Sequence, residues 1–146
     1  MKQKFIDAYM DVAERFSQLS HAKRLQVGAI VVKDDRIISI GYNGMPSGWD
    51  NECEEIIEVN ELEVETRSKP EVLHAESNAI AKLASSHESG KNATLLCTHS
   101  PCIDCAKLIY QSGIDTVYYK HNYRSTQGIE FLRKSGITVN QIPTME

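Results

Sequence analysis

The sequence predicts an α/β protein built on a mixed sheet with helices on both of its faces. Short β-branched runs alternate with longer segments whose apolar residues recur at helical spacing. The element order read from these patterns is α-β-β-α-β-α-β-α-β, and turn residues separate the elements. Sites that follow a strand and open a helix are of special interest, because ligands gather at the carboxyl ends of strands in such sheets.

The first third of the chain predicts one helix and two strands. Residues 4–19 form the helix, because their apolar side chains share one stripe. The members of that stripe are Phe5, Ile6, Tyr9, Val12, Ala13, Phe16 and Leu19. Residues 27–32 and 36–42 are strands, and the Asp34-Asp35 pair between them predicts a hairpin.

The next segment is irregular, and the rest of the chain returns to alternation. A turn-rich stretch covers 43–52, and an acidic segment to which no helix or strand is assigned covers 54–66. Pro101 and Gly113 mark the two ends of one of the later helices. The expected helices are 74–86, 101–113 and 126–136, and the expected strands are 93–99, 114–120 and 137–142.

Length and charge restrict the kind of protein. With 146 residues the chain is long enough for one domain, expected over 1–146, and short for two. The net charge is −4, and the sequence contains no basic cluster beyond Ala22-Lys23-Arg24. Both observations argue against a long nucleic acid as partner. Apolar runs are too short for a membrane span. Acidic residues within the N-terminal apolar pattern exclude a secretory signal, so a cytoplasmic location is expected.

One cluster of residue types carries metal chemistry. Cys102 and Cys105 stand three apart at the start of an expected helix, so both sulfurs face the same side within one turn. The helix N-terminus favours thiolates there. His74 opens another expected helix and can supply a third ligand, which leaves a fourth position of a zinc ion for water. Zinc lowers the pKa of such a water, and Glu76 is placed to move protons.

Each half of this pattern also has an ordinary interpretation. A lone His-x-Glu is more often a helix cap with a solvated side chain, and a lone Cys-x-x-Cys is either a metal site or a redox site. A closed structural zinc module would need a fourth ligand, from Cys53 or Cys97. A thiol–disulfide enzyme would leave His74 and Glu76 idle. Buried in a strand, Cys97 is expected to be a small apolar residue.

Taken together, the motifs match the signature H-x-E…P-C-x-x-C of the zinc-dependent nucleobase deaminases. The chain further resembles the deoxycytidylate (dCMP) deaminases of the short bacterial and phage type, over nearly its whole length. The segments that carry the resemblance are "SHAKRLQVGAIVV" (20–32), "GYNGMPSG" (41–48), "LHAESNAI" (73–80), "THSPCIDCAKLIYQSGI" (98–114) and "YYKHNY" (118–123). Deaminases of guanine, of riboflavin precursors or of tRNA adenosine are the alternatives within the superfamily.

The resemblance implies a fold and a reaction. The implied fold is the cytidine deaminase-like three-layer α/β/α arrangement around a five-stranded mixed sheet. The implied reaction is hydrolysis of dCMP to dUMP and ammonia, which supplies dUMP for thymidylate synthesis. One catalytic Zn²⁺ would be held by His74, Cys102 and Cys105, with Glu76 as the proton shuttle. Some relatives hold a second zinc through histidines before the catalytic helix, but residues 50–73 contain none.

Five residues are expected to bind the substrate. Asn43 ends a strand in a glycine-flanked turn, where its amide can bond a ribose hydroxyl; a turn asparagine that bonds its own backbone is the alternative. The backbone at Ala75 is expected to line the base pocket. Arg24 and Arg124, the latter with Tyr123, are candidates to hold the phosphate group through a guanidinium fork, although either arginine could also be a solvated surface residue.

The resemblance also implies regulation. Relatives form oligomers, often hexamers, that dCTP activates and dTTP inhibits near a subunit interface. The turn-rich stretch is the expected contributor, because its glycines permit close approach of a ligand and Trp49 offers a stacking surface. Mg²⁺ would accompany the triphosphate. The residues expected at this second site are Lys23, Gly41, Tyr42, Gly44, Met45 and Trp49.

Overall fold

A computed structural model describes residues 1–143, so the last three residues of the expected domain, 144–146, lie outside the described part. The helices are α1 (Gln3–Ser17), α2 (Ala75–Ala84), α3 (Ile103–Gln111) and α4 (Gln127–Lys134). The strands are β1 (Gly28–Lys33), β2 (Arg36–Tyr42), β3 (Glu54–Asn60), β4 (Glu63–Ser68), β5 (Thr94–His99), β6 (Thr116–His121) and β7 (Thr138–Gln141). Within these residues, no helix combines the length and the apolar character that crossing a membrane requires.

Five strands form one mixed sheet in the order β2-β1-β5-β6-β7. Strand β1 is antiparallel to both of its neighbours, whereas β5, β6 and β7 run parallel to one another. The antiparallel β1–β2 pair closes through Asp34 and Asp35, whose φ angles of 52° and 59° suit a two-residue hairpin turn. The expected mixed sheet and its hairpin are therefore confirmed.

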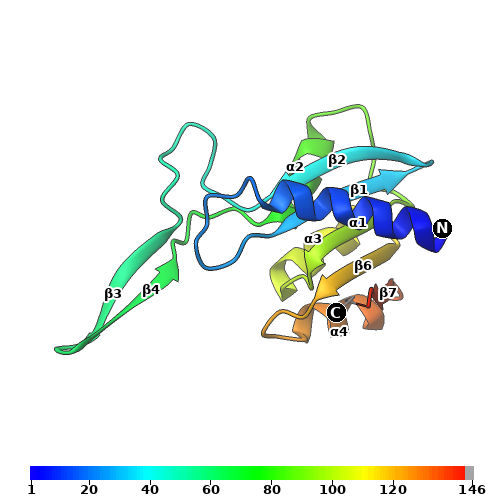
Figure 1. Ribbon diagram of the computed structural model, residues 1–146. Coiled ribbons are helices and arrows are strands. Elements are labelled where there is room, and N and C mark those ends of the chain that lie inside the picture. The colour runs from blue at the N-terminus through cyan, green and yellow to red at the C-terminus, as the bar shows by residue number, and fades with distance from the viewer. Residues whose placement is uncertain (144–146) are drawn as a thin grey trace.

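The helices cover the two faces of this sheet unequally. Helix α1 lies alone on one face, where Ile6, Met10 and Ala13 pack against β1 and β5 through Ile30 and Leu96. Helices α2, α3 and α4 cover the other face and share a second apolar core with the strands. Figure 1 shows α1 crossing in front of the strands, with α2 and α3 behind them. The three-layer α/β/α arrangement is confirmed.

The buried side of α1 is narrower than the predicted stripe. The helix ends at Ser17, so Leu19 falls beyond it and is 43% exposed. Phe5 is also largely exposed, at 46%, while Met10 is buried although the predicted stripe omits it. The buried residues of α1 stand at positions 6, 10, 13 and 17. This spacing of three or four residues places them along one narrow stripe of the helix, which is the stripe that packs against the sheet.

The acidic segment forms a β-hairpin that the sequence analysis does not assign. Strands β3 and β4 pair antiparallel as a separate two-stranded sheet, which projects from the body of the molecule in Figure 1. Most of its residues are exposed, and Leu62 at the turn is 96% exposed. Glutamate is depleted in strands, and neither face of this arm is buried, so no clean alternation marks it in the sequence.

Helix α2 lies unusually close to strand β2. A Cβ atom added at Gly41 would fall on the backbone carbonyl oxygen of Ala75, the first residue of the helix. The side chains of Ser39 and Asn78 fix the same contact, because the first donates to the carbonyl oxygen of Ala79 and the second to that of Tyr42. This contact sets the position of the start of α2 and of the residues that follow His74.

Candidate metal centre and adjoining cavities

Two helix starts bring the predicted metal ligands together. His74 is the N-cap of α2 and Cys102 is the N-cap of α3, and both have extended backbone conformations. Cys105 lies one turn further along α3 and is buried. Helix α3 begins directly beyond the carboxyl end of β5, at the central strand of the sheet. The site therefore lies where ligands gather in open α/β sheets.

The three side chains converge on one point. The Nδ1 atom of His74 lies 3.5 Å from the sulfur of Cys102 and 3.3 Å from that of Cys105. One donor atom from each residue lies within 4.8 Å of the other two. Tetrahedral zinc, with Zn–S near 2.3 Å and Zn–N near 2.0 Å, would separate nitrogen from sulfur by about 3.5 Å. The donor set and its spacing fit a zinc ion with three protein ligands.

The donors also shift one another's protonation. Hydrogen bonds with Cys105 and His74 lower the pKa of Cys102 to about 4. The hydrogen bond between His74 and Cys102 raises the pKa of His74. A separate hydrogen bond between Cys105 and Cys102, together with burial, raises the pKa of Cys105. One thiolate is thus present at neutral pH, and thiolate is the form of cysteine that binds metals.

Glu76 lies in the first turn of α2, two residues after the histidine ligand, and is only 4% exposed. Burial raises the pKa of its carboxyl group, because the charged form loses its hydration there. A buried carboxyl group with a raised pKa can both accept and return a proton near neutral pH.

A cavity of about 320 Å³ opens above these residues. The metal cluster contributes His74 and Cys102 to its wall, and Glu76 and Ala75 also line it. The remaining walls are Leu25, Val27, Asn43, Ser68, Lys69, Pro70, Val72, His99, Ser100 and Tyr123. Its size falls at the lower end of the range for small-molecule sites.

Asn43 lines this cavity, but its amide is already engaged. Its Oδ1 atom accepts a hydrogen bond from the backbone of Val27 at 2.9 Å, and its Nδ2 atom donates to Leu25 at 2.8 Å. These bonds hold the segment before β1 against the end of β2. The amide retains one N–H and free lone pairs, so a hydrogen bond to a ligand remains open to it.

Both predicted arginines line a second cavity, of about 520 Å³, which adjoins the first. Arg24 comes from the segment before β1, and Arg124 follows β6. Tyr123 borders both cavities, and the guanidinium carbon of Arg124 lies 5.8 Å from the centre of its ring. Ser68, Leu25 and His99 are likewise common to the two cavities. A ligand that spans both could therefore meet the metal centre at one end and guanidinium groups at the other.

The residues expected at a regulatory site line neither cavity. Gly41 lies under α2, where its lack of a side chain is needed for packing, and Gly44 pairs with Leu73 in an isolated bridge. Trp49 is 56% exposed on the loop between β2 and β3. The backbone N–H of Lys23 donates to the Glu54 carboxylate at 2.7 Å. Tyr42 and Met45 are partly buried beside this loop.

Among the cavity-lining residues that were not singled out from the sequence, two lie directly before the cysteine motif. His99 is the last residue of β5, and Ser100 follows it. Ser100 accepts a hydrogen bond from the backbone N–H of Tyr123 at 2.7 Å and so holds that residue against the cavities. The available signal was their position at the carboxyl end of the central strand, directly before the Pro-Cys-x-x-Cys motif.

A three-layer fold that brings an imidazole, two thiols and a buried carboxyl group to the starts of two helices is the architecture of the zinc-dependent deaminases. Comparison with known families agrees with this class. The family described as "Cytidine and deoxycytidylate deaminase zinc-binding region" matches residues 3–121. The chain belongs to this family of zinc-binding deaminases.

The chain is similar to several characterised relatives. The crystal structure of dCMP deaminase from the cyanophage S-TIM5, in complex with dCMP and dUMP, superposes with a TM-score of 0.88 and 48% identity, covering 97% of this chain and 99% of that one. Deoxycytidylate deaminase of Enterobacteria phage T4 is 34% identical over 93% of this chain and 88% of its own length. That of Saccharomyces cerevisiae is 32% identical over 100% of this chain, which spans only 47% of the yeast protein.

Proposed function

We propose that this protein is a dCMP deaminase, which hydrolyses dCMP to dUMP and ammonia with one zinc ion. The observation that carries the proposal is the pairing of two adjoining cavities: one lined by His74, Glu76 and Cys102, the other by Arg24 and Arg124. The base of a nucleotide fits the first and its phosphate fits the second. Similarity to the S-TIM5 enzyme, whose structure holds dCMP and dUMP, supports the same assignment.

His74, Cys102 and Cys105 would hold the zinc ion. When bound, zinc supplies Lewis-acid activation of a water molecule near neutral pH. Two thiolates and a neutral imidazole balance the charge of the ion, and three protein ligands leave room for that water. The N-caps that carry His74 and Cys102 are fixed by the helices behind them, so the donor set is pre-organised.

Glu76 moves the protons of the reaction. Its carboxylate accepts a proton from the attacking water and delivers it to N3 of the cytosine ring, and a second transfer lets the amino group leave from C4 as ammonia. The raised pKa of Glu76 suits both steps, because the group must be a base first and an acid afterwards. Burial among the cavity walls excludes bulk water that would otherwise exchange these protons.

Substrate selection depends on both ends of the nucleotide. Arg124 with Tyr123, and Arg24 from the other side, bind the phosphate group through charge-assisted hydrogen bonds. Asn43 uses its remaining hydrogen-bonding capacity on the sugar, and the backbone at Ala75 borders the base.

Ammonia release from a panel of substrates tests the proposal. The purified protein with zinc is assayed with dCMP, CMP, deoxycytidine, guanine and a tRNA anticodon stem, and the expected result is ammonia from dCMP at the highest catalytic efficiency. A dithiol–disulfide exchange assay runs in parallel. Efficient turnover of another member of the panel, or exchange activity without ammonia release, would overturn the assignment.

The same function includes regulation and assembly. We propose that the protein forms a hexamer in the cytoplasm and supplies dUMP for thymidylate synthesis, with dCTP as activator and dTTP as inhibitor. The triphosphate, with Mg²⁺, would bind at the loop that carries Gly44 and Trp49, near Lys23. Support comes from Trp49, a large aromatic side chain that the packing of this chain leaves 56% exposed.

A further inference from the structure

The second cavity contains two histidines that the proposed reaction does not use. His99 ends β5 and His121 ends β6, and the two residues are partners in the parallel register of these strands. Their rings lie 5.0 Å apart between centroids with a tilt of 38°. Both line the cavity that also holds Arg24 and Arg124. An imidazole pair beside two guanidinium groups is suited to an anion.

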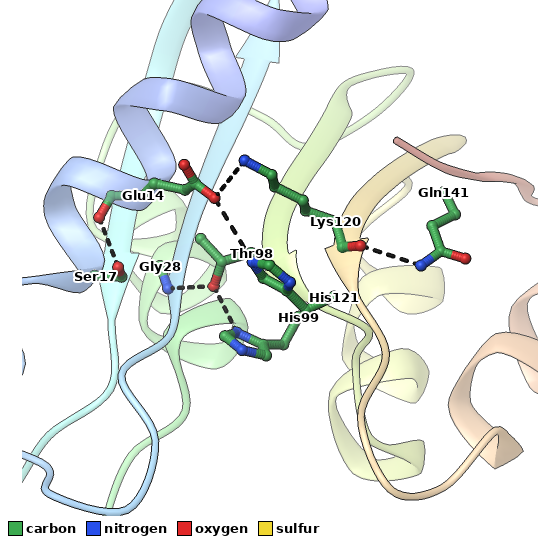
Figure 2. Close-up of polar contacts among 8 residues, drawn as sticks. All are labelled: Glu14, Ser17, Gly28, Thr98, His99, Lys120, His121 and Gln141. Carbon is green, nitrogen blue, oxygen red and sulfur yellow. Dashed lines mark hydrogen bonds and ion pairs between the residues drawn. The ribbon is translucent and has the colours of Figure 1, made fainter. Parts of the chain in front are cut away.

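Hydrogen bonding fixes the tautomer of His99. The hydroxyl oxygen of Thr98 accepts a hydrogen bond from the backbone N–H of Gly28 at 3.1 Å and lies 2.9 Å from the Nδ1 atom of His99 (Figure 2). Thr98 is only 2% exposed, and Nδ1 is the one acceptor that the described contacts offer to its hydroxyl proton. The hydroxyl therefore donates to Nδ1, and the ring proton of neutral His99 sits on Nε2.

The two rings do not share charge equally. Burial, followed by the nearby His121, lowers the pKa of His99, so His99 stays neutral at neutral pH. It can serve a ligand as a neutral Nε2–H donor. His121 is more exposed than His99 and lies beside a carboxylate.

Glu14 of α1 orients His121. Its Oε1 atom lies 3.7 Å from the Nε2 atom of His121 and 2.9 Å from the Nζ atom of Lys120 (Figure 2). A ring proton on Nε2 is favoured by that carboxylate, which leaves Nδ1 without a proton when His121 is neutral. Among the described residues, Nδ1 of His121 has no hydrogen-bond partner. In the tautomer that Glu14 favours, protonation of the ring turns this atom into a donor that can bond an anion.

We propose that His121, oriented by Glu14, recognises the phosphate group of the nucleotide and takes up a proton from solvent when that group binds. This inference rests on the proposed function and deepens it. The charged groups around His121 are Glu14 on α1, Lys120 on β6 itself and the two arginines of the cavity, with neutral His99 on β5. A phosphate dianion adds two negative charges to this set, which favours the imidazolium form.

Binding of the product dUMP tests the inference without turnover. Titration calorimetry in two buffers of different ionisation enthalpy, from pH 7 to pH 8.5, measures affinity and proton uptake together. Deoxyuridine is the matched ligand without phosphate, so any protonation change at the metal centre is common to both. In wild type the affinity for dUMP should fall as the pH rises across this range and dUMP binding should take up protons from the buffer, and both effects should exceed those seen with deoxyuridine.

His121→Asn keeps a neutral side chain of similar reach, and because the side chain is 44% exposed the fold should tolerate it. In this variant the uptake of a proton with dUMP should vanish and the pH dependence should fall below about twofold. Glu14→Gln should shift the uptake to lower pH, while Lys120→Met, which removes a cation and frees the same Glu14 oxygen for His121, should shift it to higher pH. His87→Asn, an exposed histidine away from both cavities, is the control and should match wild type.

The possible failures are distinguishable. If wild type binds dUMP no more tightly than deoxyuridine, the proposed phosphate recognition fails and this inference fails with it. If wild type prefers dUMP but His121→Asn shows the same proton uptake and the same pH dependence, only the role of His121 is overturned.

Discussion

The Nδ1 atom of His74 lies 3.3 Å from the sulfur of Cys105, although the two residues are 31 positions apart in the chain. Two different helices bring them together. The sulfur of Cys102 lies close to the same nitrogen, at 3.5 Å. A metal ion that binds all three groups would stabilise the fold, because the free energy of zinc binding adds to the free energy of folding.

Removal of a ligand should therefore remove the zinc. Cys105→Ser and His74→Ala are each expected to purify with less than about one tenth of the wild-type zinc content, because three protein ligands are the minimum for this kind of site. Metal content by mass spectrometry and the ammonia assay measure the loss. Cys53→Ser is the control, since that buried cysteine lies outside the cluster, and it should retain one zinc per chain. Full zinc occupancy in Cys105→Ser would contradict the assignment.

Glu76→Gln should separate metal binding from turnover. The amide has nearly the same shape but cannot accept and return protons, so kcat should fall by about 10²-fold or more while zinc content is unchanged. Glu130→Gln, at an exposed position of α4, serves as the control. A kcat within about threefold of wild type would mean that less than about 1 kcal/mol of barrier depends on this carboxylate, and Glu76 would not be the proton shuttle.

Arg124→Ala should lower the efficiency for dCMP without changing that for deoxycytidine. Loss of a charge-assisted hydrogen bond costs about 1.5–3 kcal/mol, which is roughly 10- to 150-fold in kcat/KM. The ratio of the two efficiencies is the measurement, because it cancels any general damage. Arg36→Ala is the control. It removes an exposed ion pair with Glu88 at the first residue of β2, and it should leave that ratio unchanged. Equal efficiencies for the two substrates in wild type would argue for a nucleoside enzyme.

Gly41→Ala should destabilise the protein. The new methyl group would fall on the carbonyl oxygen of Ala75, so α2 must shift away from β2 at a cost of about 1–3 kcal/mol in the free energy of unfolding. Denaturant unfolding of the zinc-loaded protein measures it. Gly44→Ala is the matched control, because its Cβ would meet nothing within 4 Å, and should change stability by less than about 0.5 kcal/mol.

Regulation predicts a change in the shape of the rate curve. The rate against dCMP concentration should be sigmoidal, dCTP should make it hyperbolic, and dTTP should suppress it, since each triphosphate favours a different state of the oligomer. Trp49→Ala should weaken both effects and leave the rate at saturating dCMP unaltered. Hyperbolic kinetics that respond to neither triphosphate would show that this chain carries the chemistry without the switch.

Most of the fold could be predicted because its elements are amphipathic against one sheet. Five of the six residues of strand β1 are buried, and its run of β-branched residues is the pattern that predicts a strand. The β3–β4 arm could not be predicted in the same way, since neither of its faces is buried and its cross-strand contacts, such as Glu55 with Arg67, are exposed.

Within the candidate site, the part that residue type restricts most is the cluster of His74, Cys102 and Cys105, which the structure brings together. The convergence of His74 with the cysteines could be predicted because few other arrangements use those residues at helix starts. His99 could not be singled out, because its significance depends on its register with His121 across two parallel strands. The arginines were predicted as phosphate ligands, and the structure places both in one cavity.

The position of β5 at the centre of the sheet has a consequence for biosynthesis. Strand β1 ends at Lys33, but β5, which pairs with it on the inner side of the sheet, does not begin until Thr94. Until β5 has been synthesised, the nascent chain therefore carries an apolar strand with one unpaired edge. At about 5–20 residues per second, the interval lasts roughly 3–12 s. Helix α1 can cover one face of the β1–β2 hairpin during this time, but the other face must wait for α2 and α3. Ribosomes that stall within this interval would release chains prone to aggregation, and a chaperone that binds extended apolar segments would meet this protein first at β1.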